Sequence, residues 1–176
     1  KLTGQPISVL LGGRIRSQIP VYNTCAGNQY VRGTKLGTTE NFGIDYSGTD
    51  QNYEDLDRFL NDPVGLAGSL LDMGIDSMKI WPFDFAAEST QGQFISPAEL
   101  DKALAPFKAI KKEYGDRMQI SAELHGMWNL SESLIICQAL DEIGMRWIED
   151  PVFLTNPSGI QELKRTVRSR IAIGLS

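Results

Sequence analysis

The sequence predicts an α/β fold built on a parallel sheet. From residue 19 onward, short apolar runs alternate with longer stretches of helical period, and several of those stretches begin or end at capping residues. Strands that are joined by helices of this length pair in parallel through right-handed crossovers. Both an open doubly wound sheet and a (β/α)8 barrel fit the alternation.

The predicted strands are short apolar runs bounded by turn residues. They cover residues 19–23, 77–81, 118–123, 146–149 and 170–174. Pro82 directly follows the second of them and ends it. With the helices between them, these strands give four βα units followed by one further strand.

Two of the predicted helices lie before the third strand. Apolar residues recur at helical spacing over residues 53–73, where Pro63 breaks or restarts the helix. The next helix begins at Ser96-Pro97-Ala98-Glu99, which supplies an N-cap serine, a proline at the first helical position and an early carboxylate. It runs to Tyr114 and ends at Gly115.

Two further helices follow the third and fourth strands. The sequence predicts that Ser131 caps a helix that runs through Ile143 and is closed by Gly144. The last predicted helix covers residues 157–168.

Composition excludes several classes of protein. The chain is 41% hydrophobic and 22% charged, which is ordinary for a globular domain. Its 17 basic and 22 acidic residues give a net charge of -5, so nucleic-acid binding is not expected. Apolar runs fall short of the ~18 residues that span a bilayer, so no membrane partner is expected. Cys25 and Cys137 lie far apart in apolar contexts, which predicts buried thiols and a cytoplasmic setting.

Residues 27–52 have no clear period and are rich in Gly, Thr and Asn. They predict a long loop after the first strand, where the active-site loops of a barrel lie. No Gly-rich phosphate loop follows any predicted strand, which disfavours a dinucleotide-binding sheet or a phosphate-ester barrel. Because a fifth strand cannot close an eight-stranded barrel and the first residue is Lys1, we expect the chain to be part of a longer enzyme.

Polar residues gather at the predicted strand ends, where parallel barrels place their catalytic groups. They are Lys79, Glu123, His125, Glu149 and Asp150. Three of these are carboxylates on two consecutive strands, and they would repel one another without a cation between them. Oxygen ligands at an open site suit Mg2+. A single acid at a strand end can also be a helix cap or a solvated charge.

His125 is the only histidine of the chain and lies two residues after Glu123. A period of two places both side chains on one face if the strand persists that far. Either an acid/base role or a structural hydrogen bond fits such a histidine. Lys79 and Trp81 share a face by the same reasoning, and Trp81 is expected to form a pocket wall.

The sequence resembles the mandelate racemase/muconate lactonizing branch of the enolase superfamily over nearly its whole length. The matching motifs include Gln5-Pro6-Ile7-Ser8-Val9-Leu10-Leu11-Gly12-Gly13, Val21-Tyr22, Met78-Lys79-Ile80-Trp81, Glu123 and Trp147-Ile148-Glu149-Asp150-Pro151. The resemblance implies that residues 1–18 end an N-terminal capping domain. It also implies that residues 19–176 are the N-terminal half of a (β/α)8 TIM-type barrel.

The resemblance further implies abstraction of the proton next to a carboxylate, with Mg2+ holding that carboxylate and stabilising an enediolate. Glu123 and Glu149 would be metal ligands. The third ligand would lie beyond Ser176, together with acid/base groups on later strands. Enzymes of this type are homo-oligomers, which predicts the same here.

One departure selects among the reactions of this family. Many racemases and cycloisomerases carry Lys-x-Lys on the second strand, whereas this chain has Lys79-x-Trp81. Glu123-x-His125 instead resembles the acid-sugar dehydratases, in which that histidine protonates the leaving hydroxyl. Lys79 would then orient the substrate carboxylate or lower a local pKa. We therefore expect β-elimination of water from a sugar acid.

Two alternatives remain open at this point, a racemase or cycloisomerase of the same family and an inactive barrel fragment. The expected substrate contacts are Trp81 and, in the loop after the first strand, Asn28 and Tyr30, with Arg32 as a further candidate.

Overall fold

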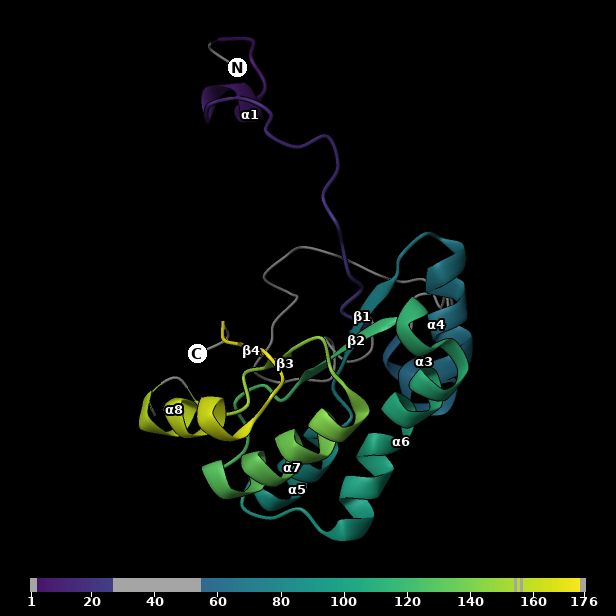
Figure 1. The fold of residues 1–176 in the computed structure, drawn as a ribbon, viewed down its shortest axis with the longest axis vertical. Coiled ribbons are helices and arrows are strands. Elements are labelled where there is room, and N and C mark those ends of the chain that lie inside the picture. The colour runs from purple at the N-terminus through teal and green to yellow at the C-terminus, as the bar shows by residue number, and fades with distance from the viewer. Residues whose placement is uncertain (1–2, 27–54, 154, 156, 175–176) are drawn as a thin grey trace, which may run out of the picture.

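The computed structural model describes residues 3–26, 55–153, 155 and 157–174. Its sheet is parallel, with the strands in the order β1-β2-β3-β4 (Figure 1). The strands are β1 (Ser77–Ile80), β2 (Gln119–Glu123), β3 (Ile148–Glu149) and β4 (Ile171–Ala172). A doubly wound sheet reverses its strand order at a switch point. The order here follows the sequence without reversal, as in consecutive strands of a barrel.

The first predicted strand, residues 19–23, is reduced to one bridge in which Asn23 pairs with Met78 in parallel. The Asn23 amide donates to the Ser77 carbonyl at 3.0 Å, and its carbonyl accepts from the Lys79 amide at 2.8 Å. Pro20 has no N–H to contribute to a ladder. The predicted strand is therefore wrong in extent, but the chain at Asn23 does lie beside β1.

Helices connect the strands, and α6, α7 and α8 form an arc along one side of the sheet (Figure 1). The helical elements are α1 (Ile7–Leu10), α3 (Asp55–Asn61), α4 (Pro63–Asp72), α5 (Asp84–Thr90), α6 (Pro97–Tyr114), the 3-10 turn η3 (Gly115–Arg117), α7 (Leu130–Ile143) and α8 (Pro157–Thr166). Neighbouring crossover helices pack against each other, α4 on α6, α6 on α7 and α7 on α8.

The capping signals read from the sequence position α4 and α6. The hydroxyl of Ser96 accepts from the Glu99 amide at 3.2 Å, and the Glu99 carboxylate accepts from the Ser96 amide at 2.9 Å, a complete capping box. Pro63 restarts the helical region as predicted, with Asp62 as the N-cap that accepts from the Gly65 amide. The predicted end of α6 at Tyr114 is confirmed.

Several predicted elements differ from the structure. Helix α7 is capped by Asn129 rather than Ser131, since the Asn129 side chain accepts from the Glu132 amide at 3.0 Å and asparagine caps as well as serine. Helix α5 was not predicted, because seven residues are too short for a clear apolar period. Strand β3 begins at Ile148, two residues later than predicted, and ends at Glu149 as predicted, where Asp150, with φ of 42°, turns the chain.

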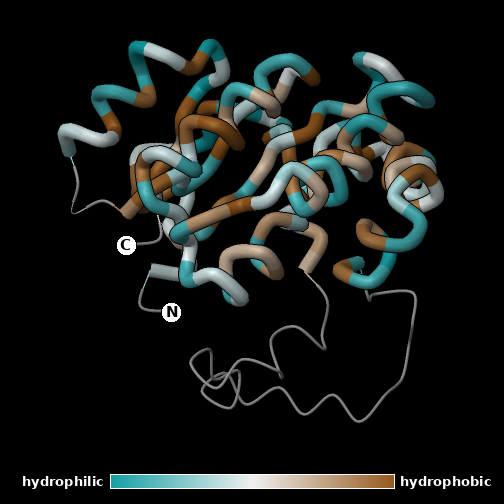
Figure 2. Tube along the Cα trace, turned by 90° about the horizontal axis from the view of Figure 1, so that it is seen from below, coloured by the Kyte–Doolittle hydropathy of each residue, from teal (hydrophilic) through white to brown (hydrophobic). Residues whose placement is uncertain are grey.

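The core lies between the sheet and the crossover helices. Figure 2 shows hydrophobic stretches along the inner segments and alternating character along the outer helices. Cys25 and Cys137 are fully buried free thiols, as predicted. Burial raises the pKa of Cys137 to about 12, so this thiol stays protonated. Among the described helices, none has the length and apolar character needed to cross a membrane.

The N-terminal segment with α1 projects away from the sheet and its helices (Figure 1). Its apolar side chains are largely exposed, with Leu11 at 81% and Ile15 at 95%. Nothing in the described contacts tests the division into a capping-domain tail at 1–18 and a barrel at 19–176, which stays a prediction.

Asp141 joins α7 to the turn that leads into β4. Its carboxylate, 5% exposed, accepts from the Arg168 amide at 2.7 Å, the Ser169 amide at 2.8 Å and the Ser169 hydroxyl at 2.5 Å. Burial raises the pKa of Asp141, but these hydrogen bonds outweigh burial and hold the pKa below its usual range.

We expect Asp141→Asn to lower the free energy of unfolding at neutral pH by about 2 kcal/mol, since hydrogen bonds to a charged group are lost. A depressed folded-state pKa gives stability that is full above the unfolded pKa of about 4 and is lost as the pH falls below it. The difference between wild type and Asp141→Asn should therefore shrink in acid. Urea unfolding at a series of pH values measures it. Asp116→Asn, at a fully exposed carboxylate, is the control, and a pH-independent difference would contradict the assignment.

Candidate active site

Three carboxylates meet at the carboxyl ends of β2 and β3. Glu123 ends β2, Glu149 ends β3 and Asp150 follows directly, and each offers an oxygen within 4.8 Å of the others. The parallel register aligns Glu123 with Glu149 across the two strands. Glu123 is fully buried and Asp150 is 2% exposed. The structure thus collects the predicted acidic cluster at one edge of the sheet.

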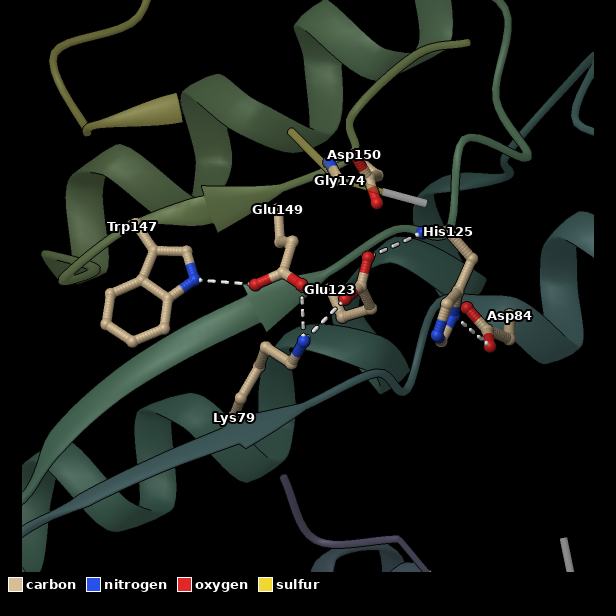
Figure 3. Close-up of polar contacts among 8 residues, drawn as sticks. All are labelled: Lys79, Asp84, Glu123, His125, Trp147, Glu149, Asp150 and Gly174. Carbon is tan, nitrogen blue, oxygen red and sulfur yellow. Dashed lines mark hydrogen bonds and ion pairs between the residues drawn. The ribbon is translucent and has the colours of Figure 1, made fainter. Parts of the chain in front are cut away.

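Lys79 of β1 supplies the positive charge in this cluster. Its Nζ lies 2.7 Å from Oε2 of Glu123 and 2.6 Å from Oε1 of Glu149, and Figure 3 shows the ammonium group between the two carboxylates. The Lys79 side chain is 8% exposed. A charge buried to this extent is costly unless it is paired. Lys79 is therefore part of the site and is not a strand-end lysine that reaches into solvent.

Burial and pairing set the pKa values of these groups in different directions. Burial lowers the pKa of Lys79, but its hydrogen bonds to Glu123 and Glu149 outweigh that effect and raise the pKa above its usual range. Burial raises the pKa of Glu123, and the hydrogen bond from Lys79 only partly offsets it. Burial also raises the pKa of Glu149, but the hydrogen bonds from Lys79 and Trp147 lower it below its usual range.

Trp147 orients the second carboxylate. Its Nε1 donates to Oε2 of Glu149 at 2.9 Å, so Lys79 and Trp147 each hold one oxygen of that side chain (Figure 3). The Trp147 ring meets the Tyr22 ring edge-on at 5.1 Å, and Tyr22 also lies under the Lys79 ammonium at 5.9 Å.

His125 lies just beyond β2, beside the acidic cluster. Its amide donates to Oε1 of Glu123 at 3.0 Å, and its Nδ1 lies 2.8 Å from Oδ2 of Asp84 on α5 (Figure 3). Burial lowers the pKa of His125, but Asp84 and Glu123 outweigh burial and raise the pKa above its usual range. The rings of Trp81 and His125 form a T-shaped pair with their centroids 5.8 Å apart.

The turns after β2 and β3 hold unusual backbone conformations. His125 has φ of 50° and Asp150 has φ of 42°, in the left-handed region that side chains seldom adopt. The two turns support each other, because the Gly126 amide donates to the Asp150 carbonyl at 2.7 Å. The Gly174 amide also donates to Oδ1 of Asp150 at 2.8 Å. Such conformations persist where neighbouring structure enforces them, commonly at functional sites.

The donor set fits a magnesium ion. All three side chains offer oxygen, which Mg2+ prefers, and Glu123 and Asp150 are already buried. Two oxygens bound to one Mg2+ at about 2.1 Å can lie at most ~4.2 Å apart. Oxygens within 4.8 Å of one another therefore need to move only slightly. Glu123, Glu149 and Asp150 are the residues that would hold the ion.

The structure brings together most of the residues predicted from the sequence. Lys79, Glu123, Glu149 and His125 form one connected cluster, with Trp81 against the histidine. The predicted substrate contacts of the first loop lie outside the described residues, namely Asn28, Tyr30 and Arg32. The assigned catalytic, metal and substrate roles of all these residues stay predictions.

Reasoning from the sequence did not assign a role to two residues of the site. Asp84 was not singled out, although an acid four residues after the end of β1 is a signal of the same kind as those at β2 and β3. Asp150 was noted as a strand-end acid but was not assigned as a ligand, and the turn after Glu149 brings it into the cluster.

The sequence profile described as "Enolase C-terminal domain-like" matches residues 64–176. The chain belongs to this family, which is part of the enolase superfamily. The match covers β1 to β4 and every charged residue of the cluster described above. The predicted family is confirmed.

This enolase-superfamily chain is similar to a solved enolase of the mandelate racemase subgroup from Agrobacterium tumefaciens. The two are 36% identical with a TM-score of 0.73, over 97% of this chain and 36% of that one. The predicted class, part of a (β/α)8 barrel, is thereby confirmed.

Two curated relatives match along almost the whole chain. A D-galactonate dehydratase family member from Marinomonas is 20% identical, and another from Chromohalobacter salexigens is 23% identical, each over 99% of this chain. The chain spans 41% of the length of each relative.

Proposed function

We propose that this chain carries part of the active site of a Mg2+-dependent sugar-acid dehydratase, a hydro-lyase. The observation that carries the proposal is the placement of His125, whose ring is held by Asp84 beside a carboxylate cluster. The similarity to two D-galactonate dehydratase family members supports the same reaction. The superfamily supports an enzyme in either case.

Each residue of the cluster has a role in the proposed elimination. Bound Mg2+ would stabilise the negative charge that develops on the substrate carboxylate when the neighbouring proton is removed. Glu123 and Glu149, with Asp150, would hold the ion. Lys79, already 2.6 Å and 2.7 Å from two of these acids, would orient the substrate carboxylate.

His125 would supply the proton for the leaving group. The bond between the alpha carbon and hydrogen breaks and its proton passes to a base, while the bond between the next carbon and its hydroxyl breaks. The imidazolium of His125 protonates that hydroxyl, which leaves as water. The resulting enol becomes a 2-keto acid. The histidine pKa, raised by Asp84 and Glu123, favours the protonated form that this step requires.

The proposed partner is a small sugar acid, with Trp81 as a pocket wall. Trp81 is 4% exposed and packs between Phe59, at 5.4 Å, and His125, so its position is fixed by two rings. The homo-oligomer, the cytoplasmic setting and the lack of nucleic-acid or membrane partners are parts of the same proposal.

The test is an assay of the full-length enzyme with Mg2+ and candidate sugar acids in D2O. A 2-keto product is the expected result. Exchange of the alpha proton without a keto product would contradict dehydration and favour a racemase.

His125→Asn should lower kcat by about 10²–10⁴-fold, and dehydration at the wild-type rate in this variant would show that the assigned role of His125 is wrong.

A further inference from the structure

Asp84 and His125 form a pair that joins two separate loops of the site. Asp84 lies in the first turn of α5, after β1, and His125 lies after β2 (Figure 3). Oδ2 of Asp84 is 2.8 Å from Nδ1 of His125. The Asp84 side chain is 4% exposed and the His125 side chain is 25% exposed. The aspartate is thus the buried member, and the histidine is the member that reaches solvent.

The two loops are also joined by bonds that do not involve this pair. The end of the α5 region is tied to the loop before α7 by other bonds, because the Asn129 amide donates to the Gly92 carbonyl at 3.0 Å. The Asn129 side chain also donates to the Gln93 carbonyl at 3.2 Å. The backbone of His125 is held separately by Glu123 and by the left-handed turn. Asp84, in contrast, contacts the imidazole ring of His125 itself.

We propose that Asp84 is a positioning residue that fixes the ring orientation and the tautomer of His125. A carboxylate oxygen accepts, so Nδ1 carries the hydrogen that faces Asp84. Nε2 is then the nitrogen left to face the substrate. The Trp81 ring, whose centroid lies 5.8 Å from that of the imidazole in a T-shaped pair, restricts rotation of the imidazole on another side. The acid role of this nitrogen rests on the proposed dehydration, whereas the ring orientation does not.

Nuclear magnetic resonance tests the pair without any activity. Because His125 is the only histidine in the 176-residue chain, ¹⁵N-histidine labelling gives one imidazole to assign. At a pH where the ring is neutral, we expect the Nδ1–H form in the wild type and a shift toward Nε2–H in Asp84→Ala. An Nε2–H ring in the wild type would overturn the proposal, and this result does not depend on any variant folding.

Kinetics of the full-length enzyme test the consequence for the reaction. Asp84→Asn should lower kcat by about 100-fold or more with KM changed less than about threefold. This pattern is expected when the substrate still binds but the general acid, His125, is misoriented. Asp101→Asn, at an exposed acid of α6, should leave both constants unchanged. A wild-type kcat in Asp84→Asn would overturn the positioning role. If the wild-type enzyme has no dehydratase activity, the proposed function is refuted. The tautomer of His125 measured by NMR would still test whether Asp84 fixes the ring.

Discussion

Replacing Glu123 with glutamine is expected to weaken Mg2+ binding at least about 100-fold. Loss of a residue that merely supports a ligand typically costs about 10–100-fold, and Glu123 is itself one of three converging carboxylates. Glutamine keeps the shape and one oxygen but removes the charge, and it leaves Lys79 paired with Glu149 at 2.6 Å. The fold should therefore survive. Titration calorimetry with MgCl2 on the 176-residue chain measures the change.

The matched control is Glu162→Gln, which makes the same chemical change at a half-exposed position on α8. It should bind Mg2+ as the wild type does. Equal affinity in the two variants would contradict the role of Glu123 as a ligand. A wild-type chain that binds no Mg2+ would contradict a working three-carboxylate site in this chain.

Lys79→Met is expected to destabilise the metal-free chain by about 3–5 kcal/mol, the usual effect of removing one member of a buried ion pair. The change leaves Glu123, with a side chain 1% exposed, facing Glu149 without a countercharge. In a chain of this size each kcal/mol shifts Tm by about 2–4 °C, so the expected loss is roughly 6–20 °C. Thermal unfolding in EDTA measures it.

Mg2+ should restore more stability to Lys79→Met than to the wild type. In the variant the ion meets two unpaired carboxylates, whereas in the wild type it must compete with the ammonium for them. Lys108→Met serves as the control, because the Lys108–Asp101 pair is exposed and such pairs contribute about 0–1 kcal/mol. Lys79 is not the countercharge of the cluster if Lys79→Met unfolds at the same Tm as Lys108→Met. The same conclusion follows if Mg2+ raises the Tm of Lys79→Met no more than that of the wild type.

Prediction from sequence succeeded where local signals are strong. The capping box at Ser96 and the helix end at Tyr114 use only neighbouring residues, so the sequence contains everything needed to place α6. The strand that ends at Glu123 is equally local, because Met118, Ile120 and Ala122 alternate with polar residues over a short stretch. Prediction from sequence failed where the apolar pattern was short or interrupted, as in α5 and at residues 19–23, where only Asn23 pairs with β1.

The candidate site shows the same division. Glu123, Glu149 and Lys79 could be named because each lies at the end of a predicted strand, and parallel strands bring such ends to one edge. The partner of the histidine could not be named. Asp84 and His125 are 41 residues apart, and only the packing of α5 against the turn after β2 brings Oδ2 and Nδ1 within 2.8 Å.

The sequence alone determined the order of the four sheet strands and of the longer helices, the acids at the strand ends and the family to which they point, because those features are local or periodic. Tertiary structure decided which charged side chains lie next to one another. It placed Lys79 between two acids and turned Asp150 into their cluster at a φ of 42°. It also gave His125 a carboxylate partner. Each of these depends on distances between separate strands and loops, which no spacing along the chain can fix.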